Sequence, residues 1–387
     1  MLTIDLDIQR AAEKSLTDHQ GANPRAAIVV MNVHTGDILA MVSSPELDPE
    51  YFAGGLSADE FQKETAILND PKLRPQINRA TQQNYAPGSI FKPVIALAAL
   101  QAGLDPNKLV DNPGYVYVGR RRIGDLASPG QYDLRRAIIY SCNTYFITVG
   151  LRAGIENIIN MAEKFHFGER TDLPTRQETA GILPTLKQAQ SPGWRDGDSA
   201  NICIGQGEMA VTPMQIAVAY SAIANGGTVL WPRLVERVET QDPASGEAAT
   251  TFPAGLARDH LGVSARNLKI LRDAMLGETE EGTGKPARVS GLEICGKTGT
   301  AQVMNTRNQE IDRTTWFASF APYENPRYAV VVMVESGTYG GPTCAPIAHD
   351  IYVELAKKDS TILQTSETLE TNRSEVHATV HNRTIVP

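Results

Sequence analysis

The sequence has only four cysteines, no long run of apolar residues and no excess of positive charge. The cysteines, Cys142, Cys203, Cys295 and Cys344, show no Cys-x-x-Cys spacing, and no histidines are set out beside them as zinc ligands. We therefore predict buried thiols, no metal and no cofactor. No segment approaches the roughly 18 apolar residues of a membrane span, and residues 1–5 lack the regions of a signal peptide. The sequence predicts a soluble chain, either cytoplasmic or separated from its anchor.

Charge excludes a further class of partner. Lys and Arg number 36 against 44 Asp and Glu, which gives a net charge of −8 at pH 7. No basic block is long enough to follow a phosphate backbone, so nucleic acid is not an expected partner. The 387 residues are 42% hydrophobic, enough for one large domain or two with a sizeable core.

Apolar periodicity predicts strands near both ends of the chain and helices between them. Helices are expected over residues 5–18, 89–102, 132–149, 155–165, 213–224 and 346–357. Strands are expected over residues 26–33, 38–43, part of 228–239, 292–300, 315–321 and 328–335. This order suggests one sheet, made of residues 1–43 and 228–358, with a helical part over 86–227 packed against it. Residues 44–85 are predicted to be an extended surface segment, and 359–387 a polar, flexible tail.

A Pro-Gly turn at residues 87–88 delivers Ser89 to the start of the apolar run 94–100. Ser89 and Lys92 should share one face of the first helical turn. A hydroxyl beside an amine is a potential nucleophile beside its base, although serine is also a common helix cap. The stretch alone does not decide between these two interpretations.

Two further motifs follow in order, Ser141-Cys142-Asn143 and Lys297-Thr298-Gly299-Thr300. Together with Ser89-x-x-Lys92 they match the three-motif set of enzymes that acylate a serine with D-alanyl peptides or β-lactams. A second Ser-x-Asn occurs at Ser199. We prefer Ser141, because apolar neighbours place it on a helix next to the core, whereas Ser199 follows a predicted loop.

The chemistry explains why these residue types are needed. Lys92 must be uncharged to take the proton of Ser89, and burial and a second cation, Lys297, would promote this. Lys297 could also pair with a substrate carboxylate, beside the hydroxyls of Thr298 and Thr300. Ser141 can relay the proton to the leaving amine, and Asn143 can orient the substrate or Lys92.

The strand carrying the third motif is expected to bind the substrate backbone. Gly299 has no side chain, so a peptide could lie close to an edge strand there. The backbone N–H groups of Ser89 and Thr300 are the natural pair of oxyanion donors.

With these motifs, the sequence resembles the transpeptidase domain of class B penicillin-binding proteins over residues 3–357. The resemblance includes Asn78-Arg79-Ala80 and the Tyr85-Ala86-Pro87-Gly88 approach to the serine, and it continues at Gly205-Gln206-Gly207-Glu208 and Thr212-Pro213-x-Gln215. Ser141–Phe146 and Asp172-Leu173-Pro174 are most similar to penicillin-binding protein 2 of the elongation machinery. Gly205–Glu208 is expected either to line the cleft or to form a tight turn.

The resemblance implies an α+β fold, an antiparallel sheet flanked by helices with a largely helical insertion. It implies that Ser89 is acylated by the D-Ala-D-Ala end of peptidoglycan stem peptides, or by β-lactams, and that a neighbouring amine takes the acyl group. It also implies a membrane anchor ahead of this domain, a location at the periplasmic face of the cell membrane and a membrane glycosyltransferase partner. Some elongation-type members hold zinc between the first two motifs, but residues 93–140 contain no histidine or cysteine, so we predict none here.

Three alternatives stay open. A β-lactamase or a D,D-carboxypeptidase of the same fold would use water in place of the acceptor amine, and water needs a base such as Glu178, which no spacing singles out. A non-catalytic β-lactam sensor or scaffold would keep the fold, although all three motifs are intact.

Overall fold

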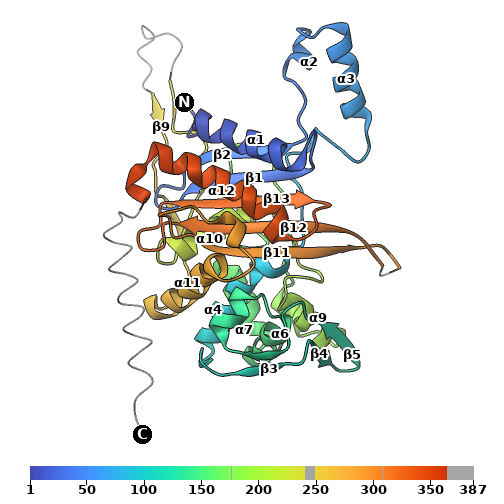
Figure 1. Ribbon diagram of the computed structural model, residues 1–387, viewed down its shortest axis with the longest axis vertical. Coiled ribbons are helices and arrows are strands. Elements are labelled where there is room, and N and C mark those ends of the chain that lie inside the picture. The colour runs from blue at the N-terminus through green and yellow to red at the C-terminus, as the bar shows by residue number, and fades with distance from the viewer. Residues whose placement is uncertain (176, 240–248, 308, 364–387) are drawn as a thin grey trace.

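The centre of the computed structural model, which describes residues 1–175, 177–239, 249–307 and 309–363, is a five-stranded antiparallel sheet (Figure 1). Its strand order is β11-β12-β13-β1-β2, so strands from both ends of the chain pair directly. The strands are β1 (Ala26–Asn32), β2 (Ile38–Ser44), β11 (Cys295–Met304), β12 (Glu310–Ala321) and β13 (Tyr328–Glu335). The predicted α+β class with an antiparallel sheet is confirmed.

The sheet is buried on both faces. Successive side chains of a strand point to opposite sides, and each side packs into its own core. In β1, Ala27 and Val29 join the core shared with the helical part, whereas Ile28 and Val30 join a second core under two helices. Those two helices, α1 (Leu6–Gln20) and α12 (Gly340–Lys358), lie side by side on this face in Figure 1. The fold therefore has three layers.

The helical part lies beside the β11 edge and fills the first core. Its helices are α4 (Lys92–Gln101), α5 (Leu134–Ile139), α6 (Asn143–Ala153), α7 (Ile155–Lys164), α8 (Leu186–Ala189), α9 (Asp196–Ile202) and α10 (Pro213–Ala224). The bounds of α10 agree with the prediction, and its capping box of Thr212 and Gln215 is present. A 3₁₀ turn, η1 (Gly88–Phe91), precedes α4.

The helical part also contains two small two-stranded sheets that the sequence did not predict. They pair β3 (Val110–Asn112) with β6 (Gly130–Tyr132), and β4 (Tyr115–Val118) with β5 (Arg121–Gly124). Two more short pairs, β7 (Thr228–Leu230) with β10 (Ala257–His260) and β8 (Arg237–Val238) with β9 (Thr250–Thr251), lie after α10.

The helices differ from the prediction at three places. The helix expected over 132–149 is two helices, α5 and α6, with Ser141 between them. Helix α11 (Ala265–Glu280), capped by Ser264, lies in a segment for which no helix or strand was predicted. Helix α12 starts at Gly340, before the expected Pro346; that prediction placed the proline in the first turn, where proline is common, but Pro346 lies inside the helix.

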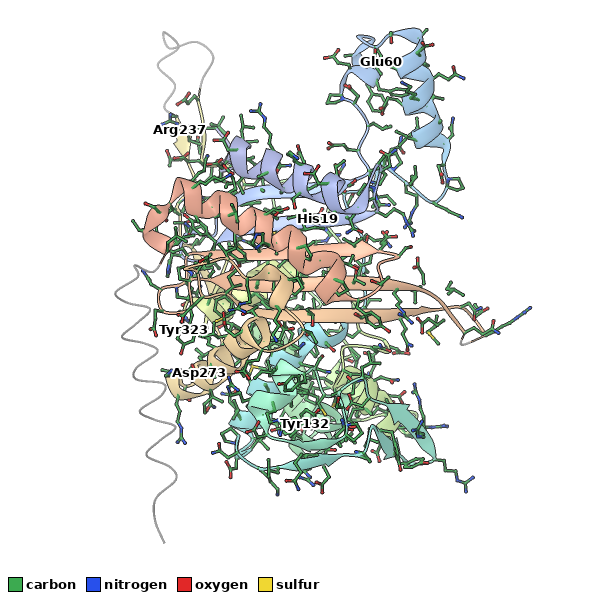
Figure 2. All side chains as sticks on the ribbon, in the orientation of Figure 1. His19, Glu60, Tyr132, Arg237, Asp273 and Tyr323 are labelled. Atoms are coloured by element: carbon green, nitrogen blue, oxygen red, sulfur yellow. The ribbon has the colours of Figure 1, made fainter. Side chains whose placement is uncertain are left out.

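The segment 44–85 was wrongly predicted to be extended throughout. It contains α2 (Glu50–Ala53) and α3 (Ala58–Asn69), which project from the body in Figure 1 and have no buried residue. A capping box joins Ser57 to Glu60, which Figure 2 labels on this projection. That Ser-x-x-Glu signature is visible in the sequence and would have predicted α3.

The first residues of the predicted tail, 359–387, have regular structure that was not expected. Residues 360–362 form a short 3₁₀ turn, η4 (Ser360–Ile362), in which Ile362 is buried, and the Asp359 carboxylate accepts a hydrogen bond from Tyr328. The remainder of the predicted tail, 364–387, lies outside the described residues. Within the described ranges, no helix is long and apolar enough to cross a bilayer.

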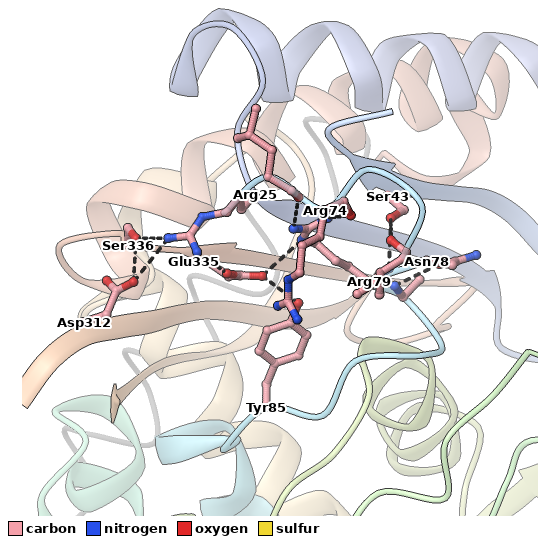
Figure 3. Close-up of polar contacts among 12 residues, drawn as sticks. Arg25, Ser43, Arg74, Asn78, Arg79, Tyr85, Asp312, Glu335 and Ser336 are labelled. Atoms are coloured by element: carbon pink, nitrogen blue, oxygen red, sulfur yellow. Dashed lines mark hydrogen bonds and ion pairs between the residues drawn. The ribbon is translucent and has the colours of Figure 1, made fainter. Parts of the chain in front are cut away.

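A buried ion-pair network ties the approach to Ser89 onto the sheet (Figure 3). Arg79 is 1% exposed, and its Nε lies 3.0 Å from Glu335 Oε1 at the end of β13. Tyr85 donates to the same oxygen at 2.9 Å, and Arg25 lies 2.9 Å from the other oxygen. Arg79 also donates to the backbone oxygens of Leu73 and Arg74, so the chain between α3 and Ser89 is fixed at this point.

Replacing Arg79 with Met is expected to lower the free energy of unfolding by about 3 kcal/mol, because a buried carboxylate loses one of its two cations. Urea denaturation followed by circular dichroism at pH 7 measures this. The matched control is Arg237→Met; Arg237 is labelled in Figure 2 and its pair with Glu239 is exposed. This variant should change stability by less than about 0.5 kcal/mol. Equal losses in both variants would show that the network contributes nothing specific.

Candidate active site

A cleft of about 430 Å³ opens between β11 and the helical part. All three motifs of the sequence contribute to its wall, through Ser89, then Ser141 and Asn143, then residues 298–300. The rest of the wall is supplied by Leu126, Tyr140, Ile204, Gln206, Thr283, Tyr339, Gly340, Gly341 and Pro342. The structure thus brings together motif residues that are up to 211 positions apart, from 89 to 300.

Ser89 is held at the cleft by the tight packing of the turn before it. Gly88 has φ 56°, and a Cβ there would lie 2.9 Å from the Thr300 carbonyl oxygen, so only glycine fits. Its N–H donates to Gly205 O at 2.8 Å. In the 3₁₀ turn that follows, residues three apart lie above one another, so Ser89 and Lys92 share a face as expected.

Lys92 connects the first two motifs. Its Nζ donates to the Ser141 carbonyl oxygen at 2.7 Å, to Ser141 Oγ at 3.2 Å and to Asn143 Oδ1 at 2.7 Å. The prediction that Ser141 sits within a helix was wrong: Ser141 has φ 56° and interrupts the helix. This left-handed residue turns its carbonyl and its hydroxyl toward the same amine, which a helical residue does not do.

The environment of Lys92 favours the neutral amine. Burial lowers the pKa of Lys92, and the charge of Lys297 lowers it further, to about 7. Asp125 and Cys142 act in the opposite direction but are weaker. At neutral pH a large fraction of Lys92 is therefore able to accept a proton.

Lys297 lies behind the cleft, where it has no exposed surface. Its Nζ lies 3.5 Å from Glu278 Oε1 and 3.1 Å from the Thr298 carbonyl oxygen. The expectation that Lys297 pairs directly with a substrate carboxylate is therefore not supported, because its charge is already paired inside the protein. Hydroxyls of Thr298, Thr300 and Thr283 line the cleft in its place.

Strand β11 presents a free edge to the cleft, since β12 is its only partner among the described strands. The Thr298 N–H points away from β12 and donates to Glu278 at 2.9 Å. Alternate residues of a strand present their N–H groups to the same side, so the Thr300 N–H points into the cleft. An extended substrate can thus pair with this edge only from Thr300 onward.

Gly299 lines the cleft, and the absence of its side chain also has a role within the protein. A Cβ on Gly299 would lie 2.9 Å from Ile90 Cγ2 and 3.1 Å from the Pro87 carbonyl oxygen. The space left by the missing side chain is filled by the protein's own turn. Gly299 therefore allows the Ser89 turn to pack on the strand.

The second Ser-x-Asn lies apart from the cleft wall. Ser199 follows the predicted loop and lies on α9, and its hydroxyl accepts a hydrogen bond from Trp194 Nε1 at 2.8 Å. The neighbouring 205–208 turn fits both of its expected roles. Gly205 and Gly207 have φ of 67° and 82°, and Gln206 lines the cleft.

Glu178, considered from the sequence as a base, and Asp125, which lies near Lys92, both have structural partners. Glu178 accepts from the backbone N–H and the hydroxyl of Thr171, at 2.8 and 2.7 Å, and it is absent from the cleft wall. Asp125 accepts from the Thr144 N–H at 2.7 Å. Across the described ranges, no three His, Cys, Asp or Glu side chains gather as a metal site, and all four cysteines are buried free thiols.

Sequence reasoning missed Glu278, which is fully buried behind the third motif. A signal for it exists, since Leu271, Ala274, Met275 and Glu278 recur at the spacing of one helix face, the buried face of α11. The adjacent Glu280 and Glu281 obscured this periodicity, because with Glu278 they make the end of the helix resemble a solvent-exposed acidic stretch.

The fold and the cleft define a penicillin-binding transpeptidase domain. Residues 26–353 match the family described as the penicillin binding protein transpeptidase domain, and the chain belongs to that family. The predicted family is confirmed.

Named relatives narrow the resemblance within the family. The peptidoglycan D,D-transpeptidase MrdA of Haemophilus influenzae is 32% identical over 374 residues, which are 90% of this chain and 55% of MrdA. The peptidoglycan D,D-transpeptidase PbpA of Mycolicibacterium smegmatis is 33% identical over 363 residues, 89% of this chain and 70% of PbpA. The chain thus spans just over half the length of MrdA.

Solved structures give the same result. The ceftriaxone acyl-enzyme complex of penicillin-binding protein A from M. tuberculosis superposes with a TM-score of 0.80 at 28% identity, over 91% of this chain and 79% of that one. PBP2 of Pseudomonas aeruginosa, in complex with WCK 5153, gives a TM-score of 0.75 at 31% identity, over 95% and 77%.

Proposed function

We propose that this chain is a peptidoglycan D,D-transpeptidase that works through an acyl-enzyme on Ser89. The Ser89 oxygen attacks the carbonyl of the D-Ala-D-Ala bond of a stem peptide, and D-alanine leaves. The amine of a neighbouring stem then takes the acyl group and frees the serine. The observation that carries the proposal is the meeting of Ser89, Ser141 and Asn143 in the wall of one cleft, against the free edge of β11, with the buried Lys92 hydrogen-bonded to Ser141 and Asn143.

Each side chain has a role that its position supports. Lys92 takes the proton of Ser89, and Ser141, 3.2 Å from Lys92, passes it to the leaving amine. Asn143 holds Lys92 in place. The N–H groups of Ser89 and Thr300 stabilise the oxyanion, because the first lies at the start of a helical turn and the second on an open strand edge.

The terminal carboxylate of the donor peptide binds at the Thr300 hydroxyl rather than to a lysine, because the hydroxyls of Thr298 and Thr283 already donate to Glu278. Thr298, Thr300 and Thr283 line the cleft, while Lys297 lies behind them.

The cleft favours transfer to an amine over rapid hydrolysis. None of the described residues that line it is Asp, Glu or His, so no lining side chain is a ready base for a deacylating water. Glu178, considered as such a base, is engaged with Thr171. This supports a transpeptidase, and a long-lived complex with β-lactams, over a β-lactamase.

The setting proposed for this activity is cell elongation at the periplasmic face of the membrane. The full-length protein would be anchored there and would act with a membrane glycosyltransferase. The support is the similarity to proteins named MrdA and PBP2, together with the family resemblance of the sequence.

Intact-protein mass spectrometry after incubation with benzylpenicillin tests the function. We expect one adduct per chain, mapped to the peptide that contains Ser89 and persisting for many minutes. A mixture of a D-Ala-D-Ala pentapeptide and an amine acceptor should give the cross-linked product. Rapid loss of the adduct would favour a β-lactamase. Release of D-alanine with no cross-linked product would favour a carboxypeptidase. An unlabelled Ser89 would favour a non-catalytic scaffold.

A further inference from the structure

Behind the third motif, one oxygen of the Glu278 carboxylate is surrounded by hydrogen-bond donors. Glu278 Oε1 accepts from the Thr298 N–H at 2.9 Å, from the Thr298 hydroxyl at 2.8 Å and from the Thr283 hydroxyl at 2.7 Å. Lys297 Nζ lies 3.5 Å from the same oxygen. The carboxylate therefore contacts both Lys297 and Thr298 of β11, and also the Thr283 hydroxyl.

The site around this carboxylate is closed. Glu278 and Lys297 have no exposed surface, and Glu278 Oε2 has no hydrogen-bond partner. A Cβ on Gly284 would lie 2.2 Å from Oε2, and a Cβ on Gly282 would lie 2.2 Å from the Ile139 carbonyl oxygen. A carboxylate enclosed in this way is stable as an anion only beside a cation, and Lys297 is that cation.

We infer that Glu278 is a positioning residue: its buried carboxylate fixes Lys297 and Thr298 and keeps Lys297 positively charged beside Lys92. The inference rests on the proposed acylation of Ser89. Glu278 does not touch the substrate; it acts through Lys297 on the base and through Thr298 on the carboxylate-binding wall.

The charge of Glu278 affects the pKa of Lys297, and the charge of Lys297 affects the pKa of Lys92. Burial lowers the pKa of Lys297, and the Glu278 charge opposes this. The charge of Lys297 is in turn the second cause, after burial, of the low pKa of Lys92. Without the carboxylate, burial would favour neutral Lys297, and Lys92 would then hold its proton to a higher pH.

The other elements packed on α11 do not replace Glu278. Helix α10 brings Tyr220, whose pKa is raised by burial and by the Glu278 charge, so it stays neutral. Helix α5 brings Arg136 at the surface and Arg135, which pairs with Glu281. The short turn η3 (Lys285–Ala287) brings the exposed Lys285, and Asp125 and Cys142 face Lys92 from the far side.

The test is the pH dependence of acylation by benzylpenicillin in Glu278→Gln. Glutamine keeps an oxygen for Thr298 and Thr283 but removes the charge. We expect the rise of the acylation rate with pH to move up by about one unit, with about a fivefold loss at pH 7 and recovery near pH 9. Glu281→Gln, three residues on in an exposed pair with Arg135, is the matched control and should leave the profile unchanged.

The possible outcomes separate this inference from the proposed function. A rate that falls equally at all pH values in Glu278→Gln would show a purely structural role and overturn the inference. A wild-type chain that takes no adduct on Ser89 would overturn the proposed function instead, and the titration below would still decide the charge of Lys297.

A titration of the wild-type chain does not depend on how the variant folds. With lysine labelled by ¹³C at Cε, nuclear magnetic resonance should show Lys92 losing its proton near pH 7 while Lys297 stays charged. Spectra of Lys92→Met and Lys297→Met assign the two signals. A neutral Lys297 at pH 7 would contradict the inference directly.

Discussion

Ser89→Ala should form no adduct with benzylpenicillin and give no cross-linked product, while the protein remains folded. The serine oxygen is the atom that becomes acylated, so its loss removes the covalent step and not only part of its rate. Ser89 is partly exposed at the cleft and its replacement leaves the Gly88 packing intact, so stability should change by less than about 1 kcal/mol. Mass spectrometry measures the adduct, and thermal unfolding measures the fold.

Ser199→Ala is the matched control for Ser89→Ala. Ser199 carries the same hydroxyl but bonds to Trp194 away from the cleft wall. It should be labelled at the wild-type rate, with a small loss of stability from the broken hydrogen bond, about 1 kcal/mol. A Ser89→Ala protein that still forms a stable adduct would show that another residue is the nucleophile.

The linear spacing of the motifs was sufficient to predict the centre of this site. Ser89 and Lys92 are three residues apart on one helical turn, so their proximity follows from local geometry alone. The preference for Ser141 over Ser199 rested on apolar neighbours, and the structure places Ser141, not Ser199, beside Lys92. The single helix predicted around Ser141 was wrong, because one left-handed residue interrupts the helix without changing the apolar pattern of the sequence.

What the sequence did not predict depends on long-range packing. That Lys297 faces inward follows from the position of a carboxylate on α11, 19 residues earlier. That Gly299 serves the Ser89 turn follows from contacts across more than 200 residues. Neither fact has a signature near its own motif, so spacing and composition identify the residue types but not what packs against them.

The segment that carries α2 and α3 shows a different limit. Its prolines and glycines suggested an irregular chain, yet Ser57 and Glu60 form a capping box and α3 follows. No residue of this helix is buried, so it lacks the apolar stripe that normally reveals a surface helix. Local capping was the only available signal, and it was outweighed by the breakers around it.

Lys92→Met should slow acylation by about 10²–10⁴-fold and abolish its rise with pH. In the wild-type chain Lys92 has a pKa of about 7, below the ordinary value of lysine, so the fraction of neutral base grows as pH rises through 7. The wild-type rate should therefore rise about tenfold for each pH unit below 7 and level off above it. Methionine fills the buried space but offers no base, so its rate should be low and flat.

Lys92→Arg distinguishes a base from a mere cation. Arginine keeps the positive charge beside Ser141 and Asn143 but does not release its proton in proteins. If Lys92 acts as the base, Lys92→Arg should be as slow as Lys92→Met at every pH from 6 to 9. Stopped-flow measurement with a chromogenic cephalosporin gives these rates, and circular dichroism reports the fold of each variant. A folded arginine variant that retains most of the wild-type rate would mean that charge alone is required, and that another group takes the proton of Ser89.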